Sequence, residues 1–574
     1  MNFIGKLSLT LTLLLVLAVT VLYLLLPTSW AAGVLCHWIN SNSQYHLAVE
    51  KIDYSWSRPT QLRLMNIKLS AGSHSVHLDA QQVTLGLGWQ QLTTPLHFHS
   101  LLLQNGTLTF DFNTPVPLPQ LRADFLQLAN MSLNTTSGQW RISGHQVNAR
   151  VLPWPSPTTN FSENSQFKLS AGSLDIASLN INGIAIKQAL IEGEFNKNHL
   201  LLSNFGAEIA GGTVTGDTLR IADGSWLCDN LRLSNTRLQS SGTLKQLWQQ
   251  SAHSLSSLPP ITFKRFDLVK ARLQGVNWAF SDLDFTLQNI TLQKGHWQAA
   301  DGSLALNATD IIIGSTHFID PIASMTFDAS GIAIKQFSTR WEGGLLRASG
   351  RWIRKIQHLQ LDDVALAALE YTLPADWKTV LRRPLPHWLS KISVAKLSAD
   401  NNLLIDITPA FPFQVTSLDT YGNNLLLAQE HHWNLWSGLL TVNASNATFN
   451  KNDLRHFTMT LNADDQQITL SNVNAFASTG LLEASATIGQ QERRPFSLQL
   501  TGRSVEINTL HNWGWPLLPL HGKGDLQLKL TGELSSEVPF KASLSGSVEA
   551  TDSNKRQISQ MMQQGEISAA TDSH

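Results

Sequence analysis

Residues 283–287, Leu283-Asp284-Phe285-Thr286-Leu287, place an apolar side chain at every second position with a polar one between. Successive side chains of a β-strand point to opposite faces, so this stretch predicts a strand with one apolar and one wet face. The pattern recurs at two later places, around Leu403, Ile405 and Ile407 and around Leu526, Leu528 and Leu530. The middle set is less regular because Leu404, between two of its members, is also apolar. All nine residues are candidates for one apolar, lipid-facing surface.

The composition extends this prediction to most of the chain. Charged residues make up only 14% of the sequence and the net charge is −1. Soluble domains average about 25% charged residues, and the difference is made up here by Ser, Thr, Asn and Gln among Leu, Ile, Val and Phe. That mixture suits strands with one solvated face, so we predict a mainly β protein. The basic excess of a nucleic-acid-binding protein is absent.

An internal repeat organises the strands. Trp297, Gly302 and Gly344 each return 136 residues later, as Trp433, Gly438 and Gly480, and a looser earlier copy holds Trp140 and Gly211-Gly212. We therefore predict three copies of one multi-strand unit, near 98–216, 263–350 and 390–486. The recurring tryptophans are interpreted as core plugs at strand ends.

Copies of a strand unit that stack on each other bury a continuous strip that no copy could bury alone. Segments with a helical period are too few to cover a sheet of this length. We therefore expect an elongated, curled repeat β-sheet that either closes on itself as a sandwich or forms an open apolar groove.

The expected organisation follows the chain in eight segments. They are a cytoplasmic N-terminus (1–6), a transmembrane helix (7–26), a membrane-proximal helix with the first strands (27–97), β-groove repeat 1 with a linker (98–262), repeat 2 (263–389), repeat 3 (390–499), C-terminal strands (500–550) and a polar, disordered tail (551–574).

The segment from Leu7 to Leu26 has no charged residue and no proline. Twenty residues at about 1.5 Å each span a hydrocarbon core of about 30 Å as a helix. Lys6 precedes the segment and the first charge after it is Glu50. The positive-inside tendency then leaves residues 27–574 outside the cytoplasm. The alternative is a cleaved signal peptide with its site near Ser29-Trp30-Ala31, although signal peptides have shorter apolar regions.

Few residues indicate chemistry. His97 and His99 share one face of a strand, but no third metal ligand is discernible nearby. Adjacent carboxylates at Asp362-Asp363 do not form the converging pair that a glycosidase needs. Cys36 and Cys228 are the only cysteines and could pair once or remain two isolated small residues. We therefore expect no catalytic residue, metal or cofactor, and no enzyme.

Several phrases, in this order along the chain, resemble the AsmA family of bacterial envelope proteins. They are 101–108 (LLLQNGTL), 211–216 (GGTVTG), 500–505 (LTGRSV) and 522–528 (GKGDLQL). The resemblance implies a single-pass protein of the bacterial inner membrane with its bulk in the periplasm. It also implies a curled β-groove and a part in moving phospholipid for outer-membrane biogenesis.

Two functional hypotheses follow. In the first, the protein handles lipid, and its partners are the membrane and phospholipid acyl chains, with envelope proteins at the far end of the groove. In the second, it is an envelope scaffold, or a regulator of protein targeting and assembly at the membrane, whose groove is filled by its own side chains.

Overall fold

The computed structural model describes residues 2–55, 57–71, 76–94, 96–111, 122–137, 140–154, 170–195, 200–247, 249, 258–294, 296–298, 301–477, 480–534, 539–568 and 571–572. The chain divides into two compact units. Unit 1 comprises Met1–Gln274 and Leu287–Gln298, and unit 2 comprises Gly275–Thr286 and Ala299–His574. The prediction of a mainly β fold is confirmed in both.

Unit 1 begins with two helices, α1 (Asn2–Leu25) and α2 (Ser29–Asn42). Thr28 caps α2 by accepting a hydrogen bond from the Ala31 amide, and α2 confirms the helix expected in the segment 27–97. The strands that follow are β1 (Tyr45–Tyr54), β2 (Gln61–Ala71), β3 (Val76–Gly86), β4 (His97–Asp111), β5 (Arg122–Ser137), β6 (Trp140–Leu152), β7 (Ser170–Ile181), β8 (Ile184–Phe195), β9 (Leu200–Ile209), β10 (Gly212–Arg220), β11 (Trp226–Ser234), β12 (Arg237–Gln239), β13 (Ile261–Gly275) and β15 (His296–Gln298), with the short helix η1 (Trp89–Leu92).

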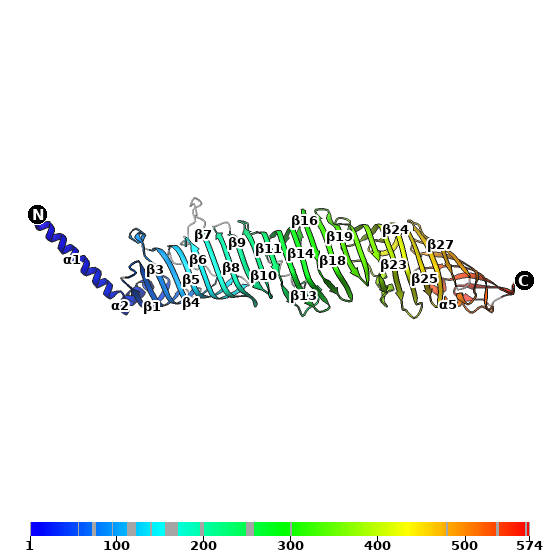
Figure 1. Cartoon of the computed structure of the whole chain (residues 1–574), viewed down its shortest axis with the longest axis horizontal. Coiled ribbons are helices and arrows are strands. Elements are labelled where there is room, and N and C mark those ends of the chain that lie inside the picture. Colours follow the sequence, from blue (N-terminus) through cyan, green and yellow to red (C-terminus); the bar gives the residue numbers. More distant parts are fainter. Residues whose placement is uncertain are drawn as a thin grey trace. The chain divides into compact units, whose positions relative to one another are not determined.

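Strands β1 to β11 lie side by side in chain order (Figure 1). Neighbours pair antiparallel from β1 to β4 and again from β5 to β11. Two junctions differ, because β5 pairs parallel with β4, and β13 pairs parallel with β11 and β12. A parallel junction needs a crossover connection instead of a hairpin, so each one marks the start of a new series of hairpins.

Unit 2 contains part of β14 (Trp278–Gln293), through which the division passes. Its further strands are β16 (Asp301–Asn307), β17 (Asp310–Ile313), β18 (Thr316–Asp328), β19 (Gly331–Trp341), β20 (Gly344–Ile353), β21 (His358–Ala367), β22 (Glu370–Thr372), β23 (Lys391–Asp406), β24 (Phe413–Gln429), β25 (His432–Phe449), β26 (Asn452–Ala463), β27 (Gln467–Phe476), β28 (Leu481–Gly489), β29 (Pro495–Glu506), β30 (Lys523–Glu533), β31 (Ser545–Asp552), β32 (Gln557–Gln563), β33 (Glu566–Ile567) and β34 (Thr571–Asp572). Short helices are α4 (Trp377–Arg382), α5 (Thr509–Asn512) and α6 (Phe540–Ser543). A parallel junction joins β23 to β21 and β22.

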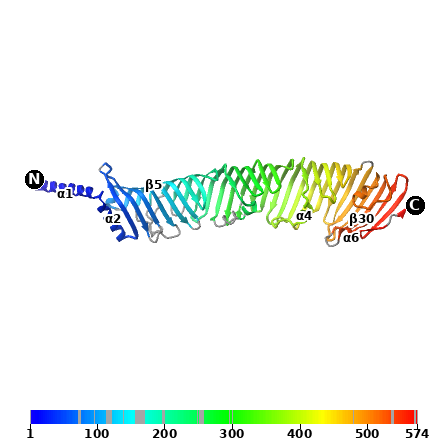
Figure 2. The same ribbon diagram turned by 90° about the horizontal axis from the view of Figure 1, so that it is seen from below.

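The long strands bend along their length (Figure 2). Many carry one non-glycine residue in the left-handed region, with φ between 49° and 54°: Asn66, Asn105, Asn130, Gln146, Gln188, Asn401, Asn424, His456, Asn472 and Ser504. Such a residue inserts one extra position into the strand, as a β-bulge does, and shifts the alternation of faces by one. In β2, for example, Leu62 and Leu64 face the core before Asn66, and Ile67 faces it afterwards.

The glycines of the sequence repeat occupy equivalent places. Gly212 and Gly344 are the first residues of their strands, and Gly480 directly precedes one. Each lies so close to the neighbouring strand that an added Cβ would be 2.1 to 2.3 Å from a backbone carbonyl oxygen. The carbonyl is that of Ser234 for Gly212, of Ala367 for Gly344 and of Arg503 for Gly480. The residue after each of those carbonyls, namely Asn235, Ala368 and Ser504, has a positive φ. Only glycine fits at these places, which explains why this landmark survives in all three copies.

The parallel junctions give the copies physical starting points. The strands that open after a crossover begin at Arg122, Ile261 and Lys391. The sequence placed the starts at 98, 263 and 390. The first expected copy therefore includes β4, which the structure pairs antiparallel with β3 in the preceding series of hairpins.

Two expectations are wrong. The tail 551–574 is not disordered in its described part, because β32 pairs with β31 and Ile558, 1% exposed, lies in the core. Its glutamines hid the alternation of Ile558, Gln560 and Met562 toward that core. Trp297 and Trp433 are not core plugs, since they are 41% and 38% exposed; the side chain of Trp140 lies outside the described residues.

Cys36 and Cys228 are both free thiols.

Candidate functional site

One apolar cluster runs across eight successive strands of unit 1. Each of β1 to β8 contributes at least one buried side chain to it, and α2 adds Ala32. We call this set the unit-1 apolar strip: Ile52, Leu64, Ile67, Ala80, Val83, Leu103, Met131, Val147, Ile176 and Ala189, with Ala32. Half-buried residues such as Leu101, Leu126 and Leu174 pack against it. None of the nine candidates from the sequence lies in this strip.

Helix α2 closes the strip at β1. The Asn40 side chain makes two hydrogen bonds to the backbone of β1. Its Nδ2 donates to the Leu47 carbonyl (3.1 Å), and its Oδ1 accepts from the Leu47 amide (2.7 Å). The opposite face of α2 exposes Trp30, Val34 and Trp38, spaced by one helical turn and 65%, 50% and 61% exposed. Helix α2 therefore has one face on the strip and a second, apolar face without protein cover among the described residues.

The apolar helices raise the question of a membrane span. Among the residues that the structure describes, no single helix has the length and hydropathy of a bilayer span, whereas Thr10–Leu25 and Ser29–Asn42 meet that test together across a bend of 87°.

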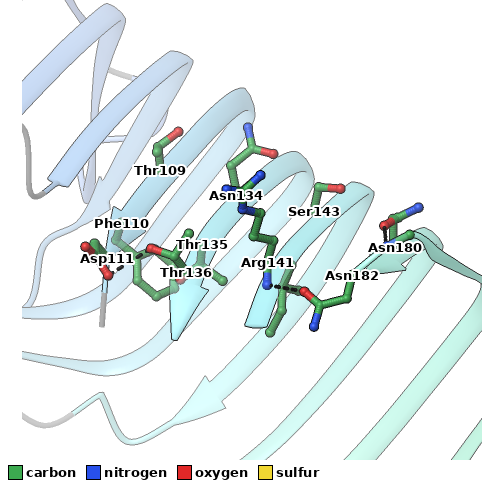
Figure 3. A pocket seen from close by; sticks show the side chains of 12 residues that line it. Thr109, Phe110, Asp111, Asn134, Thr135, Thr136, Arg141, Ser143, Asn180 and Asn182 are labelled. Atoms are coloured by element: carbon green, nitrogen blue, oxygen red, sulfur yellow. Dashed lines mark hydrogen bonds between the residues drawn. The ribbon is translucent and has the colours of Figure 1, made fainter. Parts of the chain in front are cut away.

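A polar cavity of about 690 Å³ lies at the ends of β4 to β7 (Figure 3). The side chains of Thr109, Asn134, Ser143 and Asn180 line up across its strands, and Arg141 supplies its positive charge. Two hydrogen bonds hold its edge: Thr136 Oγ1 donates to Asp111 Oδ1 (2.8 Å), and the backbone amide of Arg141 donates to Asn182 Oδ1 (2.7 Å).

Thr135 and Ile142 bring the apolar face to this cavity. They are direct cross-strand partners and therefore share a face, and the next pair along it, Leu133 and Gly144, lies beside the strip. Thr135 is 7% exposed, and its Oγ1 has no hydrogen-bond partner in the described part of the chain. The cavity thus lies at the strand ends, where the polar face with Asn134 and Ser143 and the apolar face with Thr135 and Ile142 both reach the edge of the sheet, an arrangement that suits an amphipathic molecule.

In unit 2, the prediction for Leu403, Ile405 and Ile407 is wrong. Leu404 pairs with Val415, whose side chain is in the apolar cluster of β24 and β25, whereas Ile405 pairs with Gln414 on the other face. Leu403 shares the face of Ile405 by alternation, and Ile407 lies beyond the end of β23, 69% exposed. The cause is Asn401, whose left-handed backbone shifts the alternation by one residue.

Leu526, Leu528 and Leu530 lie on a covered face. Residues 507–520, which we call the C-terminal strap, pack over β30 and bury Leu526 and Leu528 to 2% and 8% exposure, with Leu530 half-buried against the same cluster. The strap's own contribution to this core is Ile507, Leu510, Trp515, Leu518 and Leu520. These leucines therefore contact protein, and the lipid-facing prediction is wrong for them.

Hydrogen bonds fix the strap to three elements. Trp513 Nε1 donates to the Phe449 carbonyl (3.0 Å), Asn452 Nδ2 donates to the Thr509 carbonyl (2.9 Å), and Trp515 Nε1 donates to Gln560 Oε1 (2.9 Å). The sequence does not reveal this role, because its signal, two tryptophans around Gly514, fits a turn equally well.

The set in β14 is divided between the units. Leu283 and Leu287 are buried, with 6% and 7% exposure, and Phe285 is half-buried. Leu283 and Phe285 belong to unit 2, and Leu287 belongs to unit 1. Their contact with lipid stays a prediction.

The histidine pair has a partner that the sequence did not reveal. His97 Nε2 lies 3.0 Å from Oδ1 of Asp124, and His99 Nδ1 lies 3.0 Å from Oδ2 of the same carboxylate. Asp124 comes from the neighbouring strand β5. The parallel junction between β4 and β5 brings these residues together. Among the described residues, no group of three or more His, Cys, Asp or Glu side chains is arranged so that it could hold a metal ion.

Comparison with known proteins identifies a relative of nearly the same length. The chain is 41% identical over 570 residues to the AsmA family protein YicH of Escherichia coli strain K12, and the match covers 99% of this chain and 98% of that protein. No protein-family model matches the chain. Identity of this degree over 99% of the chain assigns the family: this chain belongs to the AsmA family.

Proposed function

We propose that this protein is a non-enzymatic, envelope-associated protein that handles phospholipid by burying acyl chains along the apolar face of its sheet. The unit-1 apolar strip carries this proposal, since eight successive strands each contribute a buried apolar side chain to it. Burying hydrocarbon contributes about 0.8 kcal/mol per methylene, so a chain along a uniform strip is held without any specific residue. Such a chain can also slide with little change in free energy.

The ligand's headgroup has a natural place in this proposal. The polar cavity at the ends of β4 to β7 lies beside the strip and offers hydroxyl and amide groups and the guanidinium of Arg141. Acyl chains on the strip would leave a headgroup at this edge, in contact with water.

The helices supply the membrane contact. We propose that α1 anchors the chain in the bacterial inner membrane and that the bulk lies in the periplasm, where it contributes to outer-membrane biogenesis. Membership of the AsmA family supports an envelope role. The apolar segment Leu7–Leu26 and the exposed Trp30 and Trp38 support the anchor.

A second candidate is an envelope scaffold or a regulator of protein targeting and assembly, without lipid transport. The core under the C-terminal strap favours it, because there the protein covers its apolar face with its own side chains. The two candidates differ in whether the unit-1 apolar strip ever meets lipid.

Two adjacent leucines of β4 allow a matched test. Leu101 packs against the strip, whereas Leu102 pairs with Thr84 and Gln127 on the other face. The full chain is reconstituted in vesicles that contain a fluorescent phosphatidylethanolamine, and transfer to acceptor vesicles is followed. We expect Leu101→Asp to slow transfer by about tenfold or more, because a carboxylate in the strip must be desolvated. We expect Leu102→Asp to leave the rate unchanged.

Equal rates for both folded variants would contradict the proposal. Transfer at the protein-free background rate by the unmodified chain would favour the scaffold instead.

A further inference from the structure

A second cavity lies in unit 2, where the apolar face meets the C-terminal strap. It has a volume of about 170 Å³. Its apolar lining comes from β25 to β29, the loop before β24 and the strap: Phe411, Phe449, Leu454, Phe457, Val473, Ala475, Leu482, Ala484, Leu500 and Trp513. We call it the strap pocket.

The strap pocket offers a ligand no hydrogen bond from its two polar-capable lining groups. The indole Nε1 of Trp513 already donates to the Phe449 carbonyl. Glu483 also borders the pocket, but it alternates with Leu482 and Ala484 along β28, and its carboxylate pairs with the guanidinium of Arg503 at 3.2 Å. An occupant that needs polar partners would lose them here, so the pocket fits pure hydrocarbon.

The size of the pocket limits the occupant. An apolar cavity of about 150 Å³ in a protein core takes up a benzene-sized molecule and excludes water. The strap pocket therefore has room for a hydrocarbon segment of about six carbons. That is one chain end, and neither a whole lipid nor a sterol fits.

The pocket is also where an apolar path within unit 2 ends. Phe449 and Phe457 belong both to the apolar cluster of Val415, Ala444 and Ala447 and to the packed core beneath the strap. Beyond Trp513 the strap covers this face, where its residues Leu510 and Leu520 are 2% and 1% exposed. A chain that follows this face reaches the pocket and stops.

We propose that the strap pocket binds the methyl end of a single phospholipid acyl chain, with the strap as the stop. This inference rests on the proposed lipid handling and deepens it. A uniform strip lets a chain slide, whereas a pocket bounded by the strap holds its end. Unit 2 is therefore a place where lipid is retained.

The test uses the full chain in vesicles of phosphatidylethanolamine and phosphatidylglycerol. A trace of phosphatidylethanolamine carries a diazirine on the terminal carbons of one acyl chain, and a second probe carries it on the headgroup. After irradiation, adducts are mapped by mass spectrometry. We expect the chain-end probe to label residues 449–457 and 473–484, and the headgroup probe to leave them unlabelled.

A matched pair of variants on β28 tests occupancy. Ala484 lines the pocket and is half-buried, whereas Ser485, the next residue, is exposed on the other face. Ala484→Phe fills the space of at least two methylenes, each worth about fourfold in binding, so labelling of the pocket falls by about tenfold or more. Ser485→Phe leaves labelling unchanged.

The outcomes separate the two proposals. Chain-end label on the unit-1 apolar strip but not in the strap pocket overturns this inference and leaves lipid handling intact. Label on neither surface overturns both. The labelling pattern of the unmodified chain decides this even if Ala484→Phe fails to fold.

Discussion

At the scale of single residues, the left-handed positions inside the strands determine which side chains reach the apolar face. Asn130 is representative: its side-chain Nδ2 donates to Asn105 Oδ1 (2.8 Å), and its backbone amide donates to Asn148 Oδ1 (2.9 Å). Asn105 has the same left-handed backbone one strand away. Asparagine tolerates this backbone better than other residues with a Cβ, and its side chain joins the bulges of adjacent strands.

Replacing Asn130 by valine should strain β5. A β-branched residue at a φ of 52° costs about 1–3 kcal/mol, and the hydrogen bond to Asn105 is lost as well. Asn130→Gly keeps the backbone and should cost clearly less. Hydrogen exchange of the β5 amides measures the free energy of local opening for both variants. Equal protection in Asn130→Val and the unmodified chain would show that the left-handed backbone is not required.

Asp406 gives a prediction that depends on pH. It is buried at the end of β23, where Thr408 Oγ1 and the Thr408 amide donate to its Oδ1 and Trp377 Nε1 donates to its Oδ2 (3.1 Å). The hydrogen bond from the Thr408 hydroxyl, more than any other contact, lowers the pKa of Asp406. The ionised carboxylate therefore stabilises the folded state above its unfolded pKa of about 4.

We expect Asp406→Asn to lower the melting temperature at neutral pH, because the charged acceptor is lost. The difference from the unmodified chain should shrink as the pH falls below about 4 toward the lowered pKa of the folded state. Thermal unfolding monitored by circular dichroism at several pH values measures this. A difference that grows on acidification would contradict the assigned role.

At the scale of elements, the C-terminal strap converts an apolar sheet face into a packed core. Its buried residues come from a short helix and an extended segment that the sequence did not distinguish from an ordinary connection. Strand existence was easier to predict than strand orientation. Leu403 and Ile405 were correctly placed in a strand, but a single left-handed residue, Asn401, put them on the other face.

The strap's attachment can be tested at Trp515. Its Nε1 donates to Gln560 Oε1, and both side chains are buried. Trp515→Phe leaves the glutamine oxygen without this donor, so it should destabilise the contact by about 1–3 kcal/mol. Trp388→Phe, at a position 58% exposed, is the control and should change stability by less than about 0.5 kcal/mol.

The measurement is hydrogen exchange of β32, whose amides should lose protection in Trp515→Phe alone. Unchanged exchange in β32 would mean that the strap is held by the other contacts.

At the scale of the whole molecule, the sequence predicted the mainly β class, the α2 helix and the repeat landmarks, because each depends on the local periodicity of apolar residues or on a glycine. It did not predict the unit-1 apolar strip residue by residue. The strip's members, such as Met131, Val147 and Ala189, are spaced irregularly in the sequence because the bulges interrupt the alternation. Nor did it predict that β32 is an ordered strand, since buried Gln560 and its neighbours are polar.

The account depends above all on lipid contact with the unit-1 apolar strip. Leu174 of β7 packs against the strip, whereas Asp175, the next residue, is exposed on the other face. The most direct measurement places the photoreactive amino acid p-benzoylphenylalanine at each position in the full chain, irradiates cells and detects phospholipid adducts by mass spectrometry. The account predicts adducts at position 174 and none at 175. Adducts at both positions alike, or at neither, would contradict it.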